Sequence, residues 1–266
     1  MPGAARNRWD LRRVESTGST NADVLSLARD GAGEGIVLVA DHQTAGRGRL
    51  GRTWEAPPGA SLLVSILLRP PAAVADAVTM AVGLAMAEGV ADATGVDARL
   101  KWPNDLVVAG SDDGYRKLAG ILAEADWPAR SQAGGGWSPP PPTERVAVVV
   151  GVGVNCNWGP DVPAELADRL VALDHVVGAS VSRDSVLSCF LSRLEARYDE
   201  LRADRDALVS AWKARSATLG RRVRVDLGAS DVEGTAVDVD ADGRLVVDTL
   251  EGERRTFAVG DIVHLR

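Results

Sequence analysis

Residues 46–54 combine the side chains that bind phosphate groups. The segment GRGRLGRTW holds three glycines and three arginines, although the chain as a whole has a net charge of −7. Glycine lets backbone N–H groups approach an anion closely, and guanidinium groups offer paired donors to phosphate oxygens. Trp54 adds a flat apolar face on which a nucleobase can stack. The segment therefore predicts a loop that binds phosphate.

The same glycines admit other interpretations. Gly46, Gly48 and Gly51 match the dinucleotide pattern G-x-G-x-x-G, and residues 46–53 nearly match the P-loop pattern, with Arg52 in place of lysine. Both patterns need a helix directly after the glycines, and the proline-containing residues 55–59 predict a turn or loop instead. The negative net charge disfavours a tract that grips nucleic acid, and a solvated surface loop is the remaining alternative.

Residues 101–105 place several polar groups at one expected strand end. The sequence KWPND brings a cation, an amide and a carboxylate to a turn that proline fixes. Asn104 and Asp105 offer oxygen ligands of the kind that Mg²⁺ prefers. A capped turn with exposed charges is the structural alternative.

Two further strands carry polar groups beside glycine. Lys117 begins the apolar run 117–122, in which Gly120 lets a ligand approach the backbone. Gly151 and Gly153 lie on a strand that ends at Asn155, which likewise suggests a ligand close to the chain. A solvated edge lysine and glycines needed for packing are the alternatives.

The elements that must position these groups follow from the hydrophobic patterning. Strands are expected at 9–14, 36–40, 61–68, 98–102, 106–108, 117–125 and 145–154. Helices are expected at 22–29 after a cap at Ser19–Asn21, at 74–94, at 184–202, and in a short segment with Leu208 and Trp212. This order predicts an α+β body with a mixed sheet flanked by helices.

The C-terminal part has a different texture. Five short strands are expected at 223–227, 232–239, 245–249, 256–259 and 262–265, with a hairpin turn at 240–243. They predict a small β-barrel domain at 219–266 after a catalytic domain at 1–218. Within the latter, the Gly- and Pro-rich residues 126–143 predict a mobile insertion.

Length and composition place limits on the class of protein. The 266 residues are 45% hydrophobic and 25% charged, as in an ordinary globular chain with one large and one small domain. Cys156 and Cys189 lack metal-ligand spacing and a disulfide framework. We expect no signal peptide and no apolar run near the roughly 20 residues of a membrane helix, hence a cytoplasmic protein.

Taken together, five segments in order resemble the biotin protein ligases. They are residues 19–21, Gln43 with 46–54, 101–105, 117–122 and 151–155. The resemblance implies an SH3-like barrel at the C-terminus and the biotin–[acetyl-CoA-carboxylase] ligase activity. Since about fifteen residues precede Ser16, it also implies the short form, which lacks the N-terminal DNA-binding domain.

The resemblance also implies the substrates and the residues that bind them. Biotin and ATP form biotinyl-5'-AMP, and the biotinyl group then passes to a carrier lysine. The implied catalytic residues are Arg49, Lys117 and Asp105. The implied biotin-binding residues are Ser19, Thr20, Gln43, Gly46, Arg47, Gly48, Lys117, Gly120 and Gly153. The implied ATP-binding residues are Arg49, Arg52, Trp54, Lys101, Asn104, Lys117 and Asn155, with Mg²⁺ at Asn104 and Asp105.

The implied partner is the biotin carrier domain of biotin-dependent carboxylases, with no DNA and no membrane. The oligomeric state stays open between a monomer and a weak homodimer. Two rival functions also stay open at this stage. One is a lipoate or octanoate protein ligase or transferase, and the other is a non-enzymatic ligand sensor or nucleic-acid binder.

Overall fold

The computed structural model describes residues 8–110, 114–126, 140–160, 162, 164–228 and 230–265. The chain divides into two compact units. The first unit contains Met1–Ala75 and Ile121–Asn155, and the second contains Asp76–Gly120 and Cys156–Arg266. Most of the expected insertion at 126–143 lies outside the described residues, so its mobility stays a prediction.

The first unit is built on a mixed sheet. Its strands lie in the order β1 (Asp10–Thr17), β2 (Ile36–Gln43), β3 (Ser61–Leu68) and β7 (Ala147–Asn155), followed by the end of β6 (Tyr115–Asp126). β1 pairs with β2 in parallel, whereas β2–β3 and β3–β7 are antiparallel. β3 is buried at all eight positions, as its continuous apolar run predicts.

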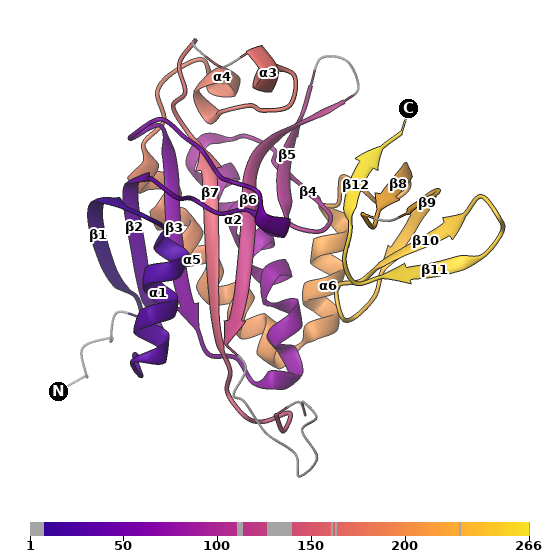
Figure 1. The fold of residues 1–266 in the computed structure, drawn as a ribbon, viewed down its shortest axis with the longest axis horizontal. Helices are drawn as coiled ribbons and strands as arrows, with labels where there is room; N and C mark the ends of the chain where they lie inside the picture. Colours follow the sequence, from indigo (N-terminus) through magenta and orange to yellow (C-terminus); the bar gives the residue numbers. More distant parts are fainter. Residues whose placement is uncertain are drawn as a thin grey trace. The chain divides into compact units, whose positions relative to one another are not determined.

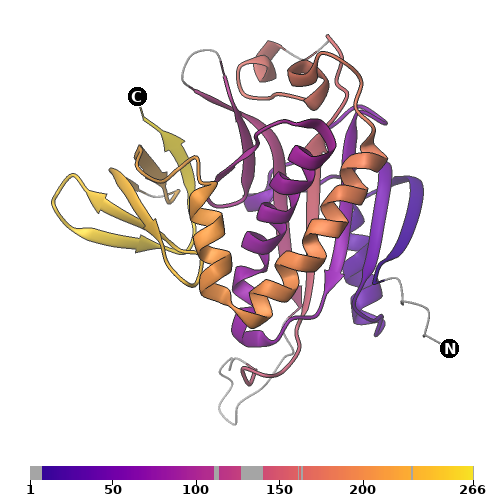
Figure 2. The same ribbon diagram turned by 180° about the vertical axis from the view of Figure 1, so that it is seen from behind.

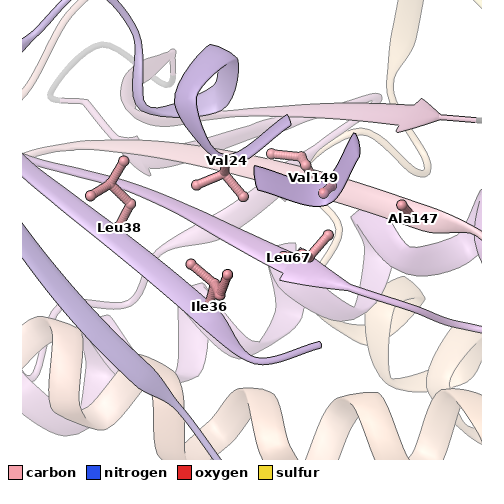
Figure 3. Close-up of a cluster of buried hydrophobic side chains, with 7 residues drawn as sticks. Val24, Ile36, Leu38, Leu67, Ala147 and Val149 are labelled. Atoms are coloured by element: carbon pink, nitrogen blue, oxygen red, sulfur yellow. The ribbon is translucent and has the colours of Figure 1, made fainter. Parts of the chain in front are cut away.

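Helix α1 (Thr20–Arg29) packs on this sheet and forms a core with it (Figure 1). Val24 and Ala28 recur four residues apart and point from one face of the helix. Figure 3 shows Val24 among aliphatic side chains of the strands. These partners are Ile36 and Leu38 of β2, Leu67 of β3, and Ala147 and Val149 of β7. The helix start at residue 20 is thereby fixed against β2, β3 and β7.

The described part of the second unit includes a β-hairpin and the helices α2, α5 and α6. β4 (Arg99–Lys101) pairs with β5 (Asp105–Ala109), and β5 pairs with the start of β6 as far as Gly120. Helices α2 (Val78–Thr94) and α5 (Arg183–Ala203) lie side by side (Figure 2). α6 (Arg205–Ala214) follows α5 directly.

Helix predictions in this unit are confirmed with two differences. The apolar stripe of α5 is buried, including Leu187, Leu194 and Tyr198. The expected helix at 74–94 begins with a 3₁₀ segment, Ala72–Ala77, before α2. Two short helices, α3 (Ala164–Ala167) and α4 (Leu173–Val177), were not predicted, because neither is long enough to show a helical period.

The expectation about apolar runs needs a correction. Residues Ala72–Thr94 form, among the described residues, one helix that is long and apolar enough to cross a membrane by length and composition. Within that stretch 72% of the most apolar window is buried inside the protein. Most residues of α2 are buried around its full circumference, which is typical of a core helix.

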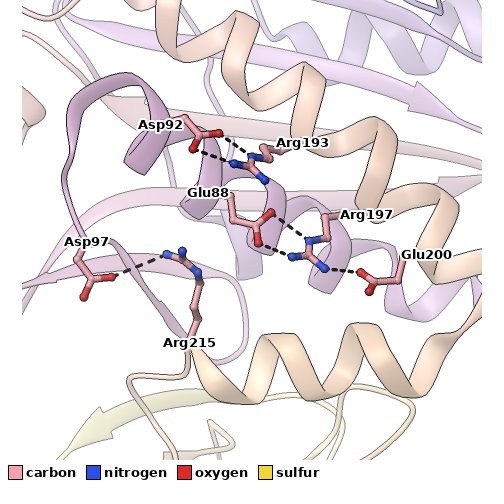
Figure 4. A network of polar contacts seen from close by, with 7 residues as sticks. All are labelled: Glu88, Asp92, Asp97, Arg193, Arg197, Glu200 and Arg215. Carbon is pink, nitrogen blue, oxygen red and sulfur yellow. Dashed lines mark hydrogen bonds and ion pairs between the residues drawn. The ribbon is translucent and has the colours of Figure 1, made fainter.

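Ion pairs on the flank of the α2–α5 contact join the two helices (Figure 4). Arg193 of α5 donates to Asp92 of α2 at 2.6 and 2.9 Å. Arg197 donates to Glu88 at 2.5 and 3.0 Å and to Glu200 at 2.5 Å. The bidentate geometry of both pairs fixes the register of α5 along α2.

Gly89 of α2 marks the closest approach of these helices. A Cβ atom at this position would lie 2.6 Å from both the Cα and the N atom of Phe190 in α5. We expect Gly89→Ala to lower the free energy of unfolding by about 1 kcal/mol or more, since overpacking costs about 1–3 kcal/mol and outweighs a helix-propensity gain of about 1 kcal/mol. Urea denaturation measures the change. Gly18→Ala, where a Cβ would meet no atom within 4 Å, is the control. Equal midpoints for the two variants would contradict the prediction.

The C-terminal strands of the second unit form an antiparallel sheet. β8 (Arg222–Asp226), β9 (Asp231–Val239), β10 (Leu245–Thr249), β11 (Arg254–Phe257) and β12 (Asp261–His264) lie in the order β11-β10-β9-β8-β12. All five expected strands are present, and the 240–243 turn joins β9 to β10. The α+β class with a mixed sheet and a small C-terminal β-domain is confirmed.

This C-terminal sheet contacts the rest of the second unit through the turn after β9 and through β9 itself. The indole Nε1 of Trp102 donates to the carbonyl of Gly243 at 2.8 Å. Lys213 of α6 pairs with Asp238 of β9 at 2.6 Å. The turn that follows Lys101 is therefore anchored to the C-terminal sheet.

Candidate active site

Polar side chains of the first unit meet where α1 begins. Gln43, at the end of β2, accepts hydrogen bonds through Oε1 from the backbone N and the Oγ1 of Thr20, at 2.8 and 2.9 Å. Ser19 occupies the N-cap position in an extended conformation, makes no capping hydrogen bond through its side chain, and is 6% exposed. A few buried polar groups that converge at one place are typical of a binding site. Of the predicted biotin-binding residues, Ser19, Thr20 and Gln43 are thus brought together.

The arginine–glycine loop closes on itself. The N–H of Gly48 donates to the carbonyl of Arg52 at 2.6 Å, and the N–H of Trp54 donates to the carbonyl of Gly46 at 3.0 Å. Leu50 has a φ of 55°, a left-handed conformation that costs a non-glycine residue roughly 1–2 kcal/mol. No helix follows the glycines, as expected, because residues 54–57 have no regular structure. The dinucleotide and P-loop interpretations are therefore wrong.

Trp54 lies directly over β7. A Cβ at Gly153 would be 2.5 Å from Cε2 and 2.7 Å from Cζ2 of the indole, so only glycine admits the ring at this position. Asn155, at the end of the same strand, is 1% exposed and pairs with Ser61 of β3. The predicted adenine-binding residues Trp54 and Asn155 therefore lie on or against one strand of the first unit.

The predicted charged residues of the second unit form a compact cluster. The Nζ of Lys117 is 2.6 Å from Oδ1 of Asp105. The backbone of Lys117 is held on both sides, because its N–H donates to the carbonyl of Arg169 and its carbonyl accepts from Val171. Asp105 is opposite Gly120 in the β5–β6 ladder and opposite Lys101 in the β4–β5 hairpin. The turn at residues 101–105 and the start of β6 thus bring Lys101, Asp105 and Lys117 to one place.

Lys101 shares this environment. Burial lowers the pKa of its ammonium group, while Asp105 raises it and the nearby Lys117 lowers it. Two ammonium groups around a single carboxylate leave a net positive charge. Such a site attracts an anion, and a phosphate oxygen would relieve the repulsion between Lys101 and Lys117.

His264 of β12 lies close to this cluster and was not predicted from the sequence. Its Nε2 is 3.3 Å from Oγ1 of Thr218, which itself accepts a hydrogen bond from the N–H of Trp102 at 3.1 Å. The Thr218 hydroxyl proton is therefore available to Nε2 of a neutral imidazole. Burial, Lys101 and Arg221 lower the pKa of His264 to about 4.

This lowered pKa predicts a pH-dependent stability. Because the folded pKa lies below the usual value of about 6.5, unfolding takes up a proton between these values, and stability is lost as the pH falls from 6.5 towards 4. After allowance for partial exposure we expect a loss of about 1–2 kcal/mol, absent in His264→Gln. Urea denaturation of both proteins at pH 7 and pH 4.5 measures it. Parallel losses in the two proteins would contradict the assignment.

Three residues that sequence reasoning did not single out as site residues also bind the predicted ones. Ser65 of β3, Asn21 of α1 and Glu124 of β6 make hydrogen bonds with Thr20 or Arg47 or with each other. Asn21 lies in the recognised 19–21 segment but was given no role. Ser65 and Glu124 carried no sequence signal, because each is an isolated polar residue in an apolar or alternating strand.

Comparisons with known proteins show the family to which this chain is related. Residues 12–134 match the biotin/lipoate A/B protein ligase family, and residues 218–265 match the biotin protein ligase C-terminal domain. The biotin–[acetyl-CoA-carboxylase] ligase of Mycobacterium tuberculosis is 39% identical over 99% of this chain and 92% of its own length. The ligase of the same name from Paracoccus denitrificans is 34% identical over 87% and 91%.

A solved structure shows the same fold. The biotin protein ligase from Aquifex aeolicus in complex with biotin and ATP has a TM-score of 0.74 and 26% identity, covering 96% of this chain and 98% of that one. The mixed sheet, its helices and the C-terminal sheet thus define a protein ligase of the biotin/lipoate class. Within that class, the chain belongs to the biotin protein ligase family. It is an ATP-dependent enzyme, so the non-enzymatic alternative is wrong, and the lipoate alternative is not favoured.

Proposed function

We propose that this enzyme activates biotin with ATP and attaches it to a lysine of a biotin carrier domain. A carboxylate oxygen of biotin attacks the α-phosphorus of ATP, and pyrophosphate leaves with the bonding electrons. The carrier amine then attacks the carbonyl carbon of the mixed anhydride, an amide forms, and AMP leaves. The observation that carries the proposal is the net positive cluster of Lys101, Lys117 and Asp105.

The first step joins two anions, so its main obstacle is electrostatic repulsion. Lys117 and Lys101 supply fixed positive charge to the phosphates and to the biotin carboxylate as charge develops in the transition state. Arg49 and Arg52 add guanidinium donors from the 46–54 loop. Leu50, which lies between them, has a positive φ, and this strained conformation distinguishes the loop from an ordinary turn. Asn104, next to Asp105, would bind the nucleotide beside Lys101.

Recognition of the two neutral groups is assigned to polar residues and Gly153 of the first unit and to Gly120 of the second. The ureido ring of biotin would bind Ser19, Thr20 and Gln43, with the backbone of residues 46–48, while Gly120 and Gly153 leave room for the bicycle. Trp54 would stack on adenine, and Asn155 would form hydrogen bonds with it. Support comes from the burial of Thr20 and from the close packing of the Trp54 indole against Gly153.

Closure of the 46–54 loop protects the intermediate. Biotinyl-5'-AMP is a mixed anhydride that water hydrolyses, and a lid over it excludes water. Arg49 and Arg52 tie the order of the loop to the presence of phosphate, so that it closes when substrate is bound.

Asn104 and Asp105 do not fit Mg²⁺ as a complete site of their own. The described residues contain no group of three or more His, Cys, Asp or Glu that could hold a metal ion. Asp105 is also engaged by Lys117 at 2.6 Å. ATP supplies phosphate oxygens to Mg²⁺ in many enzymes, so we propose that the ion accompanies the nucleotide, and no step above depends on a protein-held metal.

In the second step a positively charged lysine must lose a proton before it attacks. Asp105 is the proposed group that orients this lysine and accepts its proton. The proposed partner is the carrier domain of a biotin-dependent carboxylase in the cytoplasm, without DNA or membrane, and the enzyme is a monomer or weak homodimer. Residues 1–218 would carry the chemistry, and 219–266 would form a separate SH3-like domain.

The test measures pyrophosphate release from ATP with biotin, with lipoate, and without either acid. We expect release with biotin alone, followed by biotin transfer when a carboxylase carrier domain is added. Equal release with lipoate would favour the lipoate alternative. No release with either acid would remove the proposed adenylation.

A further inference from the structure

Six polar side chains of the first unit form one continuous hydrogen-bond chain, which we call the polar chain. Ser65 Oγ lies 2.7 Å from Thr20 Oγ1 and 2.6 Å from Asn21 Oδ1. Asn21 Nδ2 donates to Oε2 of Glu124 at 2.8 Å, and Arg47 Nη2 donates to the same oxygen at 2.9 Å. In order, the members are Gln43, Thr20, Ser65, Asn21, Glu124 and Arg47. The polar chain thus runs from the residues proposed to bind biotin to the 46–54 loop.

The orientation of the Asn21 amide is determined by its partners. Besides Glu124, its Nδ2 donates to the backbone carbonyl of Leu122 at 3.1 Å. Both are acceptors only, so the NH₂ group must face them and Oδ1 must face Ser65. Gly151 makes room for this amide, because a Cβ there would collide with Oδ1 and lie 2.9 Å from Cγ of Asn21.

This orientation commits the only hydroxyl proton of Ser65. Because Asn21 Oδ1 can only accept, Ser65 must donate to it, and Ser65 can then only accept from Thr20. Thr20 also lies 2.9 Å from Gln43 Oε1, which needs the same Thr20 proton. Three oxygen–oxygen contacts therefore share two hydroxyl protons. One contact therefore has no proton. Either Thr20 Oγ1 or Gln43 Oε1 keeps a lone pair that can accept a hydrogen bond from the ligand.

We propose that Glu124, Asn21 and Ser65 are positioning residues that make Thr20 and Gln43 acceptors for a urea N–H group. This inference rests on the proposed function and assigns roles to three residues outside its predicted site. The carboxylate of Glu124, together with the carbonyl of Leu122, orients the Asn21 amide, and this amide sets the direction of the hydrogen bonds to Ser65 and Thr20. A cyclic urea, whose nitrogens carry one donor hydrogen each, supplies the missing proton.

The same carboxylate connects ligand recognition to the loop. Glu124 Oε2 holds both Asn21 and Arg47, so a change in the loop alters the partner that orients Asn21. Thr20, Asn21 and Ser65 are all less than 5% exposed. Water therefore competes little for these hydrogen bonds, and their direction is preserved as far as Gln43.

The experiment compares biotin with its two mono-N-methyl derivatives, in which one urea N–H is replaced by N–CH₃. Calorimetry without nucleotide gives the affinity of each ligand for the wild type and for Ser65→Ala. Loss of the Ser65 hydroxyl leaves the Thr20 proton free for Gln43, so this pair no longer lacks a donor, whereas Asn21 Oδ1 loses the donor that Ser65 supplied. We expect biotin to bind about tenfold more weakly to Ser65→Ala, and the preference of biotin over at least one methyl derivative to shrink.

A merely structural role for Ser65 would weaken all three ligands by the same factor, and this result would overturn the proposal. So would affinities within twofold of the wild type in every case. If the wild type binds no biotin, the proposed function fails as well. If the wild type binds biotin and the variant shows an unchanged preference, the inference about positioning alone fails.

Glu124→Gln is a second variant that keeps the size of a partly exposed side chain. Ser65 and Glu124 belong to one chain, so their effects on biotin affinity should be non-additive in the double variant. Glu15→Gln makes the same change at an exposed position of β1 and should combine additively with Ser65→Ala. Thermal melting confirms that each variant is folded. Additive effects of Ser65→Ala and Glu124→Gln would contradict a shared chain.

Discussion

Replacing Lys117 with alanine should lower the rate of biotin adenylation by roughly 10²-fold or more. The variant removes an ammonium group from the phosphate site and leaves Asp105 without its ion-pair partner at 2.6 Å. The site then loses one positive charge and keeps a negative one, which adds repulsion to the attack of one anion on another. Single-turnover pyrophosphate release with saturating biotin and ATP measures the effect.

Lys213→Ala is the matched control. Lys213 is also in the second unit and also pairs with a carboxylate at 2.6 Å, but this partner, Asp238, lies in the C-terminal sheet. The chain contains three lysines, so the comparison covers the lysine outside the proposed phosphate site. The fold of Lys117→Ala should persist, because hydrogen bonds to the backbone of Arg169 and Val171 hold residue 117. Pyrophosphate release at near wild-type rate would refute the assigned role.

Gly153→Ala should weaken ATP binding by about tenfold or more. The added Cβ would lie 2.5 Å from Cε2 of Trp54, so the indole must leave its position on β7. Stacking of a base on an aromatic side chain contributes about 1–3 kcal/mol, and 1.4 kcal/mol corresponds to a factor of ten. Calorimetry with ATP after saturation with biotin measures the loss.

Gly33→Ala serves as its control, because a Cβ at this exposed position of the first unit would meet no atom within 4 Å. Wild-type ATP affinity in Gly153→Ala would show that the position of the Trp54 ring does not matter for the nucleotide. A larger effect on biotin than on ATP would instead place the indole beside biotin.

The elements of the fold were largely predictable from short-range patterns. The apolar run 61–68 coincides with β3, and the stripe on 184–202 corresponds to α5, because burial imposes a period on the sequence of each element. Residues 156–182 carried no such period, so α3 and α4 were missed. The start of the helix at 74–94 was also wrong, since sequence periodicity does not distinguish a 3₁₀ turn from the first turn of an α-helix.

The residue types of the candidate site were likewise visible in the sequence. The arginine–glycine loop and the lysine-containing turn predict phosphate chemistry because few other functions require these groups in such short segments. The structure adds that Lys117 pairs with Asp105 and that Trp54 lies on Gly153, and neither contact follows from spacing.

The sequence by itself therefore determined the strands, the longer helices and the kind of ligand. Only the tertiary structure decided which polar groups act together. Asn21 meets Ser65 across 44 residues and Glu124 across 103, and His264 meets Thr218 across 46. The physical reason is that the direction of a buried hydrogen bond depends on how many protons its partners can supply. Those partners are residues far apart in the sequence, and only the packing of the strands and helices brings them together.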